Sequence, residues 1–221
     1  MVRLMVVAGL VGSFGAMTCL DNARAEMENA GAAWRGQEGL VRLVQNRQDP
    51  ASIYRDNIRG VFTIHTDHGL GSGFTFAVGL IATNAHVVGN SSLVEVEEQN
   101  GNKFRARVIK KDVEHDFAIL APEGGIRPFA TTIPLRLGSV PAIGEAIVLI
   151  GSPGGFKGTV TSGIVSQVYP EGVVQLNVSI NPGNSGGPVF DSQGRVFGIA
   201  TLKYDGGDGI GFAIPIRWLV P

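Results

Sequence analysis

Short apolar runs, each bounded by turn residues, recur through most of this chain and favour an all-β fold. The first six runs are enough strands for one barrel, and they span residues 61–66, 73–78, 80–83, 93–96, 104–109 and 117–120. A passage rich in proline and glycine, residues 121–134, is predicted to connect them to a second set. That set spans residues 146–150, 159–168, 173–178, 189–190, 196–202 and 210–214. The 32 glycines suit the many tight turns that such a fold requires.

The first 25 residues are predicted to be a signal peptide. Arg3 precedes an uncharged apolar stretch that ends at Leu20, and Ala23-Arg24-Ala25 provides a small-residue cleavage site. An uncleaved membrane anchor is the alternative, although the stretch is slightly short for a spanning helix and contains glycines. We therefore expect an exported protein, periplasmic or extracellular.

Residues 26–57 are expected to form an N-terminal helical segment ahead of a folded domain at residues 58–221. A weak helical stripe runs from Leu40 to Val44, and Pro50 is predicted to end it. The only cysteine, Cys19, lies in the leader, so the mature chain must rely on apolar burial rather than on disulfides.

Composition argues against several classes of partner. The formal net charge is −1 and no block of lysine or arginine occurs, so we expect neither nucleic acid nor anionic lipid as a partner. His65 and His68 flank a predicted turn and lack further metal-ligand residues, so we interpret both as solvated and predict no metal and no cofactor. The glycine-rich residues 151–159 lack the Gly-Lys-Ser/Thr ending of a phosphate loop and are predicted to form a turn between strands.

The hexapeptide GNSGGP, residues 183–188, is typical of a serine nucleophile presented by a glycine-built turn. A serine hydroxyl needs a base to take its proton and donors to receive the oxyanion. The glycines would let the chain aim Ser185 outward and point the N–H groups of Gly183 and Ser185 at one spot. By itself the motif also fits an ordinary surface loop, because these residue types are common in turns.

The order of the candidate residues along the chain narrows the choice of fold. All four histidines precede Ser185, whereas in α/β-hydrolases the acid and then the histidine follow the serine. His86 follows an apolar run, and Asp116 stands at the mouth of another, so that a buried carboxylate could orient the imidazole. The order His86, Asp116, Ser185 matches that of chymotrypsin rather than that of subtilisin. His115 is a rival base, but neighbouring strand residues face opposite sides, and we favour His86.

Five motifs in order give the chain a resemblance to trypsin-like, chymotrypsin-fold serine proteases, and within them to the HtrA/Deg group. They are TNAHVV (83–88), DFAIL (116–120), TVTSGIVS (159–166), INPGNSGGP (180–188) and IGFAIP (210–215). The resemblance implies a double six-stranded antiparallel β-barrel, with one barrel at about residues 58–121 and the other at about 133–215. It also implies a triad of His86, Asp116 and Ser185, with an oxyanion hole formed by the amides of Gly183 and Ser185.

The sequence departs from the family pattern in three places. It ends at Pro221 without a PDZ domain, so we expect no PDZ-mediated peptide sensing from this chain. The connection after Ser166 is shorter than the family's regulatory loop, which argues against allosteric activation of the HtrA kind. Asn184 replaces the aspartate that pairs with a freed N-terminal amine in zymogens, which argues against activation by propeptide cleavage.

The resemblance also implies where the substrate side chain binds. The sixth residue before the nucleophile floors the pocket, and here it is Ser179, so a preference for lysine or arginine is disfavoured. Ala200 stands where glutamate-specific relatives carry a histidine. Together with Ile180, Thr201 and Leu202, these residues predict a neutral pocket for small or medium aliphatic side chains.

We therefore expect an exported serine endopeptidase that acts on proteins or peptides, above all unfolded ones. A protease-like module that binds peptides without cutting them is the alternative. No membrane partner is expected beyond an uncleaved leader. HtrA relatives are commonly trimers, and Ile53, Tyr54 and Ile58 would serve a homotrimer contact unless they pack within the chain.

Overall fold

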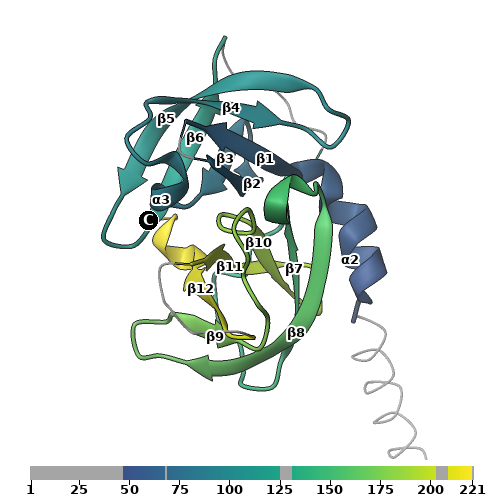
Figure 1. Ribbon diagram of the computed structural model, residues 1–221. Coiled ribbons are helices and arrows are strands. Elements are labelled where there is room, and N and C mark those ends of the chain that lie inside the picture. Colours follow the sequence, from purple (N-terminus) through teal and green to yellow (C-terminus); the bar gives the residue numbers. More distant parts are fainter. Residues whose placement is uncertain (1–46, 68, 125–130, 203–208, 221) are drawn as a thin grey trace, which may run out of the picture. The chain divides into compact units, whose positions relative to one another are not determined.

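Two closed six-stranded antiparallel barrels make up the folded domain, as the sequence predicted (Figure 1). The computed structural model describes residues 47–67, 69–124, 131–202 and 209–220. The first barrel contains β1 (Val61–Thr66), β2 (Gly69–Ala77), β3 (Leu80–Thr83), β4 (Leu93–Glu97), β5 (Lys103–Asp112) and β6 (Phe117–Pro122). The second contains β7 (Ala146–Gly151), β8 (Thr159–Val168), β9 (Val174–Leu176), β10 (Pro188–Asp191), β11 (Val196–Thr201) and β12 (Gly211–Pro215).

The two barrels share one strand order. Around the first barrel the order is β1-β2-β3-β6-β5-β4, and around the second it is β7-β8-β9-β12-β11-β10. Adding six to each strand number of the first barrel gives the order of the second, so β1 corresponds to β7, β2 to β8, and so on. The connection from β3 to β4, which contains the short helix α3 (Ala85–Val88), therefore corresponds to the connection from β9 to β10. The connections from β5 to β6 and from β11 to β12 correspond in the same way. These four connections carry every residue of the predicted triad.

Each barrel has its own apolar core, and a third cluster is shared. Phe62 and Leu120 are fully buried in the first barrel, and Leu149 and Leu176 are fully buried in the second. The shared cluster combines side chains of both barrels with side chains from outside them, and it contains Ile53, Val61, Phe74, Ala82, Phe117, Ile133, Val148, Ile150, Phe190, Val196, Ile199, Ile214, Ile216 and Leu219. Because this cluster takes residues from both barrels, it ties their relative position to apolar burial.

A short helix, α2 (Pro50–Asn57), precedes the first barrel, and Pro50 does not follow directly on a helix, because residues 47–49 are not helical. Pro50 instead begins α2, where a missing N–H costs nothing, and the Asp49 carboxylate accepts a hydrogen bond from the Ser52 amide at 2.7 Å. The stripe from Leu40 to Val44 and the predicted signal peptide lie outside the described residues.

The apolar residues of α2 and the turn after it face the barrels. Ile53 is only 1% exposed in the shared cluster, and Tyr54 and Ile58 pack against that cluster. All three residues therefore pack within the chain. The sequence had left open either this packing or a contact in a homotrimer. The 3₁₀ turn η1 (Ile58–Gly60) then leads into β1.

All twelve predicted strands are present, with differences at their ends. β2 begins at Gly69 rather than at residue 73, because Gly69 and Leu70 continue the pairing with Thr66 and His65 across the hairpin. The prediction of a solvated turn for His65 was wrong, since its ring lies in β1 and its Nε2 contacts Glu97 Oε2 at 2.8 Å. His68 lies outside the described residues. Among the residues described, no helix is both long and apolar enough to cross a bilayer.

Candidate active site

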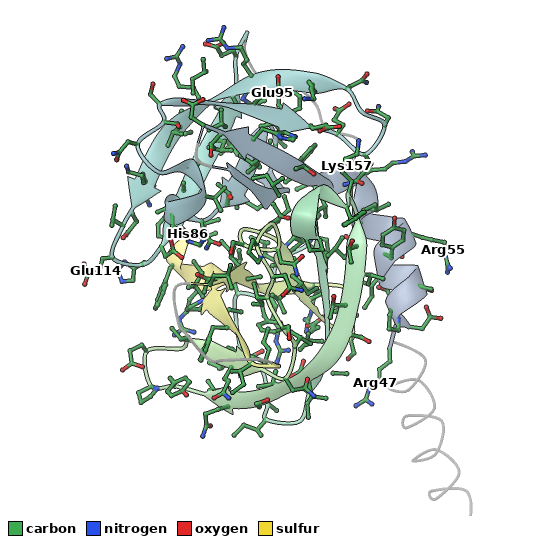
Figure 2. The ribbon with its side chains drawn as sticks, viewed as in Figure 1. Arg47, Arg55, His86, Glu95, Glu114 and Lys157 are labelled. Atoms are coloured by element: carbon green, nitrogen blue, oxygen red, sulfur yellow. The ribbon has the colours of Figure 1, made fainter. Side chains whose placement is uncertain are left out.

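His86 and Asp116 lie against each other at the edge of the first barrel. His86 is in α3, and Figure 2 shows it where the two barrels meet, whereas Glu95 and Glu114 lie on the outside of the first barrel. Both carboxylate oxygens of Asp116 lie 3.0 Å from His86 Nδ1, and the His86 backbone N–H donates to Asp116 Oδ1 at 3.1 Å. The carboxylate thus holds the imidazole and its backbone together, and it sets Nδ1 as the protonated nitrogen.

Asp116 adopts an uncommon backbone conformation in order to reach His86. Its φ of +57° is the only positive φ recorded for a non-glycine residue in the described part of the chain. Asn84, the residue before α3, donates from Nδ2 to the carbonyl oxygen of Asp116 at 2.9 Å and is fully buried. Asp116 therefore sits in a turn ahead of β6 and not in the strand itself.

Hydrogen-bond donors from two residues, one in each barrel, converge on the buried Asp116 carboxylate. Burial alone would raise its pKa, but the hydrogen bonds from His86 and from Thr201 Oγ1, the latter at 2.7 Å, outweigh burial and hold the pKa below its ordinary value. Thr201 was predicted to line the substrate pocket, and its hydroxyl instead contacts Asp116. Sequence reasoning missed this contact because Thr201 lies at the end of β11, in the other barrel.

His115 does not compete for the same position. Its Nδ1 lies 2.9 Å from Asp112 Oδ2, and its ring packs 4.6 Å from that of Trp218, which belongs to the C-terminal turn η3 (Ile216–Trp218). The structure pairs Asp116 with His86 and pairs His115 with Asp112. The physical reason is the turn at Asp116 rather than the strand alternation on which the prediction relied.

A tight turn precedes Ser185 in the second barrel. The Asn184 N–H donates to the Asn181 carbonyl at 2.9 Å, with Pro182 second and Gly183 third in the turn. Gly183 has φ +103°, which is the pattern of a type II turn. A Cβ at Gly183 would lie 2.2 Å from the Ser152 carbonyl oxygen, so only glycine fits.

Hydrogen bonds fix the orientation of two peptide groups at this turn, Pro182–Gly183 and Asn184–Ser185. The Pro182 carbonyl accepts from the Gly154 amide at 2.9 Å, and the Asn184 carbonyl accepts from the Gly187 amide at 3.0 Å. In a trans peptide the N–H points opposite to the C=O, so the amides of Gly183 and Ser185 point away from these acceptors. Neither amide donates to any described residue, and both remain available to a ligand oxygen.

Ser185 and His86 line one cavity of about 480 Å³, together with Leu70, Pro182 and Gly183 among others. Ser185 is 3% exposed, and its Oγ has no hydrogen-bond partner among the described residues. The His86 side chain is 41% exposed. A serine–histidine hydrogen bond that is long or absent before substrate binds is common in enzymes of this chemistry.

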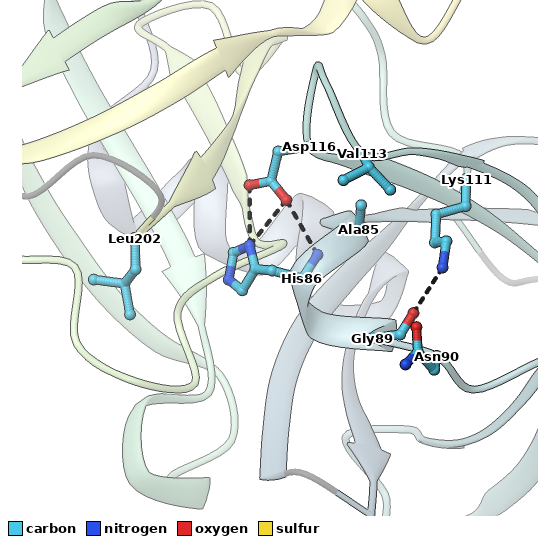
Figure 3. A pocket seen from close by; sticks show the side chains of 8 residues that line it. All are labelled: Ala85, His86, Gly89, Asn90, Lys111, Val113, Asp116 and Leu202. Carbon is cyan, nitrogen blue, oxygen red and sulfur yellow. Dashed lines mark hydrogen bonds and ion pairs between the residues drawn. The ribbon is translucent and has the colours of Figure 1, made fainter.

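A second cavity of about 400 Å³ adjoins His86 on its Asp116 side (Figure 3). Leu202 of the second barrel and Val113 of the first are part of its lining, and at its rim Lys111 Nζ donates to the Gly89 carbonyl at 2.9 Å. Leu202 lines both cavities and is 42% exposed. The two cavities therefore share His86 and Leu202 in their linings.

The remaining residues of the predicted pocket lie deeper or farther along the chain. Ile180 and Ala200 are buried in the second barrel's core, and Ser179 is exposed, with its Oγ accepting from the Gly209 amide at 3.0 Å. Charged side chains are not found among these positions. The pocket assignment stays a prediction.

Comparison with known proteins places this arrangement among proteases. A family model described as a trypsin-like peptidase domain matches residues 71–199. Protease Do-like 1, chloroplastic, of Arabidopsis thaliana is 32% identical over 228 residues, covering 92% of this chain and 51% of that protein. The periplasmic serine endoprotease DegP of Salmonella typhimurium is 40% identical over 159 residues, covering 66% of this chain and 33% of that protein.

A crystal structure of the serine endoprotease from Yersinia pestis superposes with a TM-score of 0.69 and 32% sequence identity. That alignment covers 78% of this chain and 64% of the other. The chain spans about half of the Arabidopsis relative and about a third of the Salmonella relative.

Proposed function

Because the chain belongs to the trypsin-like peptidase family, we propose that it is a serine endopeptidase that cuts protein substrates through His86, Asp116 and Ser185. One observation carries the proposal: the buried Asp116 carboxylate contacts His86 Nδ1, and His86 lines the same cavity as Ser185. An ordinary surface loop at residues 183–188 would not require an oriented imidazole beside the same cavity.

The chemistry begins with proton transfer. The Asp116 carboxylate accepts a hydrogen bond from His86 Nδ1–H and stays ionised, so Nε2 carries the free lone pair that takes the proton of the Ser185 hydroxyl. The Ser185 oxygen attacks the carbonyl carbon of the scissile peptide bond, and the carbonyl oxygen becomes an oxyanion. The amides of Gly183 and Ser185, which donate to no described residue, stabilise that charge by donating hydrogen bonds to the oxyanion.

The second half of the reaction reverses the proton path. His86 gives its proton to the leaving amine, the peptide bond breaks, and an acyl-enzyme ester on Ser185 remains. Water then gives a proton to His86 and attacks the ester, which releases the acid product and restores Ser185. A buried, ionised Asp116 stabilises the imidazolium in both halves, which its lowered pKa favours.

A fluorophosphonate probe tests the proposal directly. We expect stoichiometric labelling of the wild-type chain at Ser185, loss of labelling in Ser185→Ala, and loss of casein hydrolysis in the same variant. Asp116→Asn should lower kcat by about 10⁴, because the imidazole would present the wrong nitrogen. Equal casein turnover by wild type and Ser185→Ala would contradict the proposal.

A catalytically silent peptide-binding module is the second candidate, and the unpartnered Oγ of Ser185 is the observation in its favour. The probe separates the two candidates. A folded sample that binds casein peptides but takes up no label would favour the silent module.

For specificity, we propose small or medium aliphatic residues before the scissile bond. Ser179 and Ala200 bring no charge to the predicted pocket, and Leu202 adds an apolar wall to the cavity at Ser185. A panel of peptides that differ only at this position should give the highest kcat/KM for valine, alanine, isoleucine or leucine. Faster cleavage after arginine or glutamate would contradict this assignment.

We also propose export, with cleavage after Ala25. Relatives of this chain carry names that place them in the periplasm or the chloroplast, and the first residues fit a leader. N-terminal sequencing of the protein from its native host should begin at Glu26. A retained leader in the membrane fraction would favour the anchor instead.

A further inference from the structure

A buried serine of the first barrel contacts the turn that carries the proposed oxyanion hole. Ser72 lies in β2 and is fully buried. Its Oγ donates to the Gly183 carbonyl at 2.6 Å, and its backbone N–H donates to the Ser185 carbonyl at 2.7 Å. One residue therefore binds the carbonyls of both residues whose amides face the cavity.

The position of the Ser72 hydroxyl is fixed by its own surroundings. The Ser152 amide donates to Ser72 Oγ at 2.9 Å, which leaves the hydroxyl proton for Gly183. Thr83 Oγ1 donates to the Ser72 carbonyl at 2.7 Å and holds the backbone from the other side. With its one proton directed to Gly183, the hydroxyl can hold only one orientation of that carbonyl.

Gly183 needs such support because its backbone is the most flexible in the turn. A glycine has access to both signs of φ, so rotation of its peptide groups has a low steric cost. If the Pro182–Gly183 peptide group turned over, the Pro182 carbonyl would point toward the cavity and the Gly183 N–H would point away from it. The hydrogen bond from Ser72 keeps the adjoining Gly183 carbonyl in the orientation found here.

The chain makes room for this contact with glycines. A Cβ at Gly186 would lie 2.0 Å from the Ser72 carbonyl oxygen, and a Cβ at Gly71 would lie 3.1 Å from the Ser185 carbonyl oxygen. β2 therefore lies close to the turn at residues 183–186. It brings the Ser72 hydroxyl within hydrogen-bond distance of Gly183.

We propose that Ser72 is a positioning residue for the oxyanion hole, acting through the Gly183 carbonyl rather than on the substrate. The inference rests on the proposed protease function. It assigns a catalytic consequence to a side chain that does not itself line the cavity and reaches it only through Gly183.

Kinetics of Ser72→Ala test the proposal, because the variant keeps the backbone N–H that binds Ser185 and loses only the hydroxyl. Oxyanion donors act in the transition state, so kcat should fall by about tenfold to a hundredfold while KM changes little. Affinity for a peptide boronate, which forms a tetrahedral adduct, should fall by the same factor. Affinity for an uncleaved peptide, measured in a Ser185→Ala background, should not change.

The matched control is Thr75→Val. Thr75 is another fully buried hydroxyl of β2, and it donates to the Thr131 carbonyl at 2.5 Å, away from the site. It should lower the melting temperature about as Ser72→Ala does and leave kcat unchanged. Equal kcat for wild type and Ser72→Ala, or an equal loss of kcat in Thr75→Val, would overturn the proposal.

Ser72→Cys covers the case in which Ser72→Ala does not fold. The thiol has a similar shape but donates weakly, so an intermediate kcat is expected, and a wild-type kcat would again overturn the proposal. Failure of the wild-type chain to label with fluorophosphonate would instead reject the proposed protease function. The two failures are therefore distinguishable.

Discussion

The side-chain amide of Asn84 donates to the carbonyl oxygen of Asp116 and so supports a left-handed backbone at that residue. Left-handed conformation costs a non-glycine residue roughly 1–2 kcal/mol. The hydrogen bond offsets part of that cost, and it turns the Asp116 carboxylate toward both nitrogens of His86 that it binds.

Removing this amide should impair catalysis through Asp116. We expect Asn84→Ala to lower kcat about tenfold, since a lost hydrogen bond of about 1 kcal/mol would loosen the carboxylate. In an Asp116→Asn background the same change should have little further effect, because the two residues act as one unit. Additive losses in this double-mutant cycle would contradict the role.

Asn57→Ala is the matched control for Asn84→Ala. Asn57 is also a buried asparagine whose Nδ2 donates to a backbone carbonyl, that of Ile53 at 2.9 Å, but it lies at the end of α2. It should reduce stability and leave kcat unchanged.

The lowered pKa of Asp116 predicts how stability depends on pH. A carboxyl whose pKa is lower in the folded than in the unfolded chain stabilises the fold fully above the unfolded pKa of about 3.9, and this contribution is lost as pH falls through the folded pKa. Urea denaturation of wild type and Asp116→Asn should show a difference in unfolding free energy that is constant above about pH 5 and shrinks below pH 4. A difference that grows on acidification would reverse the assigned sign.

The hydroxyl of Thr201 should matter for the same carboxylate. Hydrogen bonds to charged groups contribute about 1.5–3 kcal/mol, so Thr201→Val should lower kcat by about tenfold or more and raise the pKa of Asp116. Thr201→Ser keeps the hydroxyl and should retain most of the activity. Similar kcat values for the two variants would argue against a role of the hydroxyl.

Gly183→Ala should disrupt the turn at residues 181–184 that orients the Gly183 amide. The new methyl would meet the Ser152 carbonyl oxygen, and we expect the fluorophosphonate labelling rate to drop by about 10² or more. Gly144→Ala isolates the cost of the backbone conformation, because Gly144 has φ +83° and nothing within 4 Å of an added Cβ. That control should lose roughly 1–2 kcal/mol of stability and keep its labelling rate.

The proposed triad could be predicted from the sequence because each member lies in a local motif whose residue types have a physical meaning. His86 and Asp116 each adjoin an apolar run, and Ser185 lies among glycines. The strands were found for a similar reason, since alternation and turn residues are local signals.

The supporting contacts could not be predicted, because they join segments far apart in the chain. Ser72 and Gly183 are separated by 111 residues, and Thr201 and Asp116 by 85. The sequence predicted Thr201 in the pocket wall and gave no sign that its hydroxyl would contact Asp116. The start of a helix at Pro50 was missed for a different reason, since proline both precedes and ends helices and only the cap at Asp49 decides between the two.

The division of the site between two barrels orders events during synthesis. Asn84, His86 and Asp116 leave the ribosome well before Ser185 and Thr201, and N-terminal parts of a chain generally fold first. The first barrel then contains the His86 imidazole and the Asp116 carboxylate before Ser185 has been synthesised. Under the proposed function, the site would be complete only when the second barrel has folded and its turn at residues 183–188 contacts Ser72, so the first barrel alone would have no proteolytic activity.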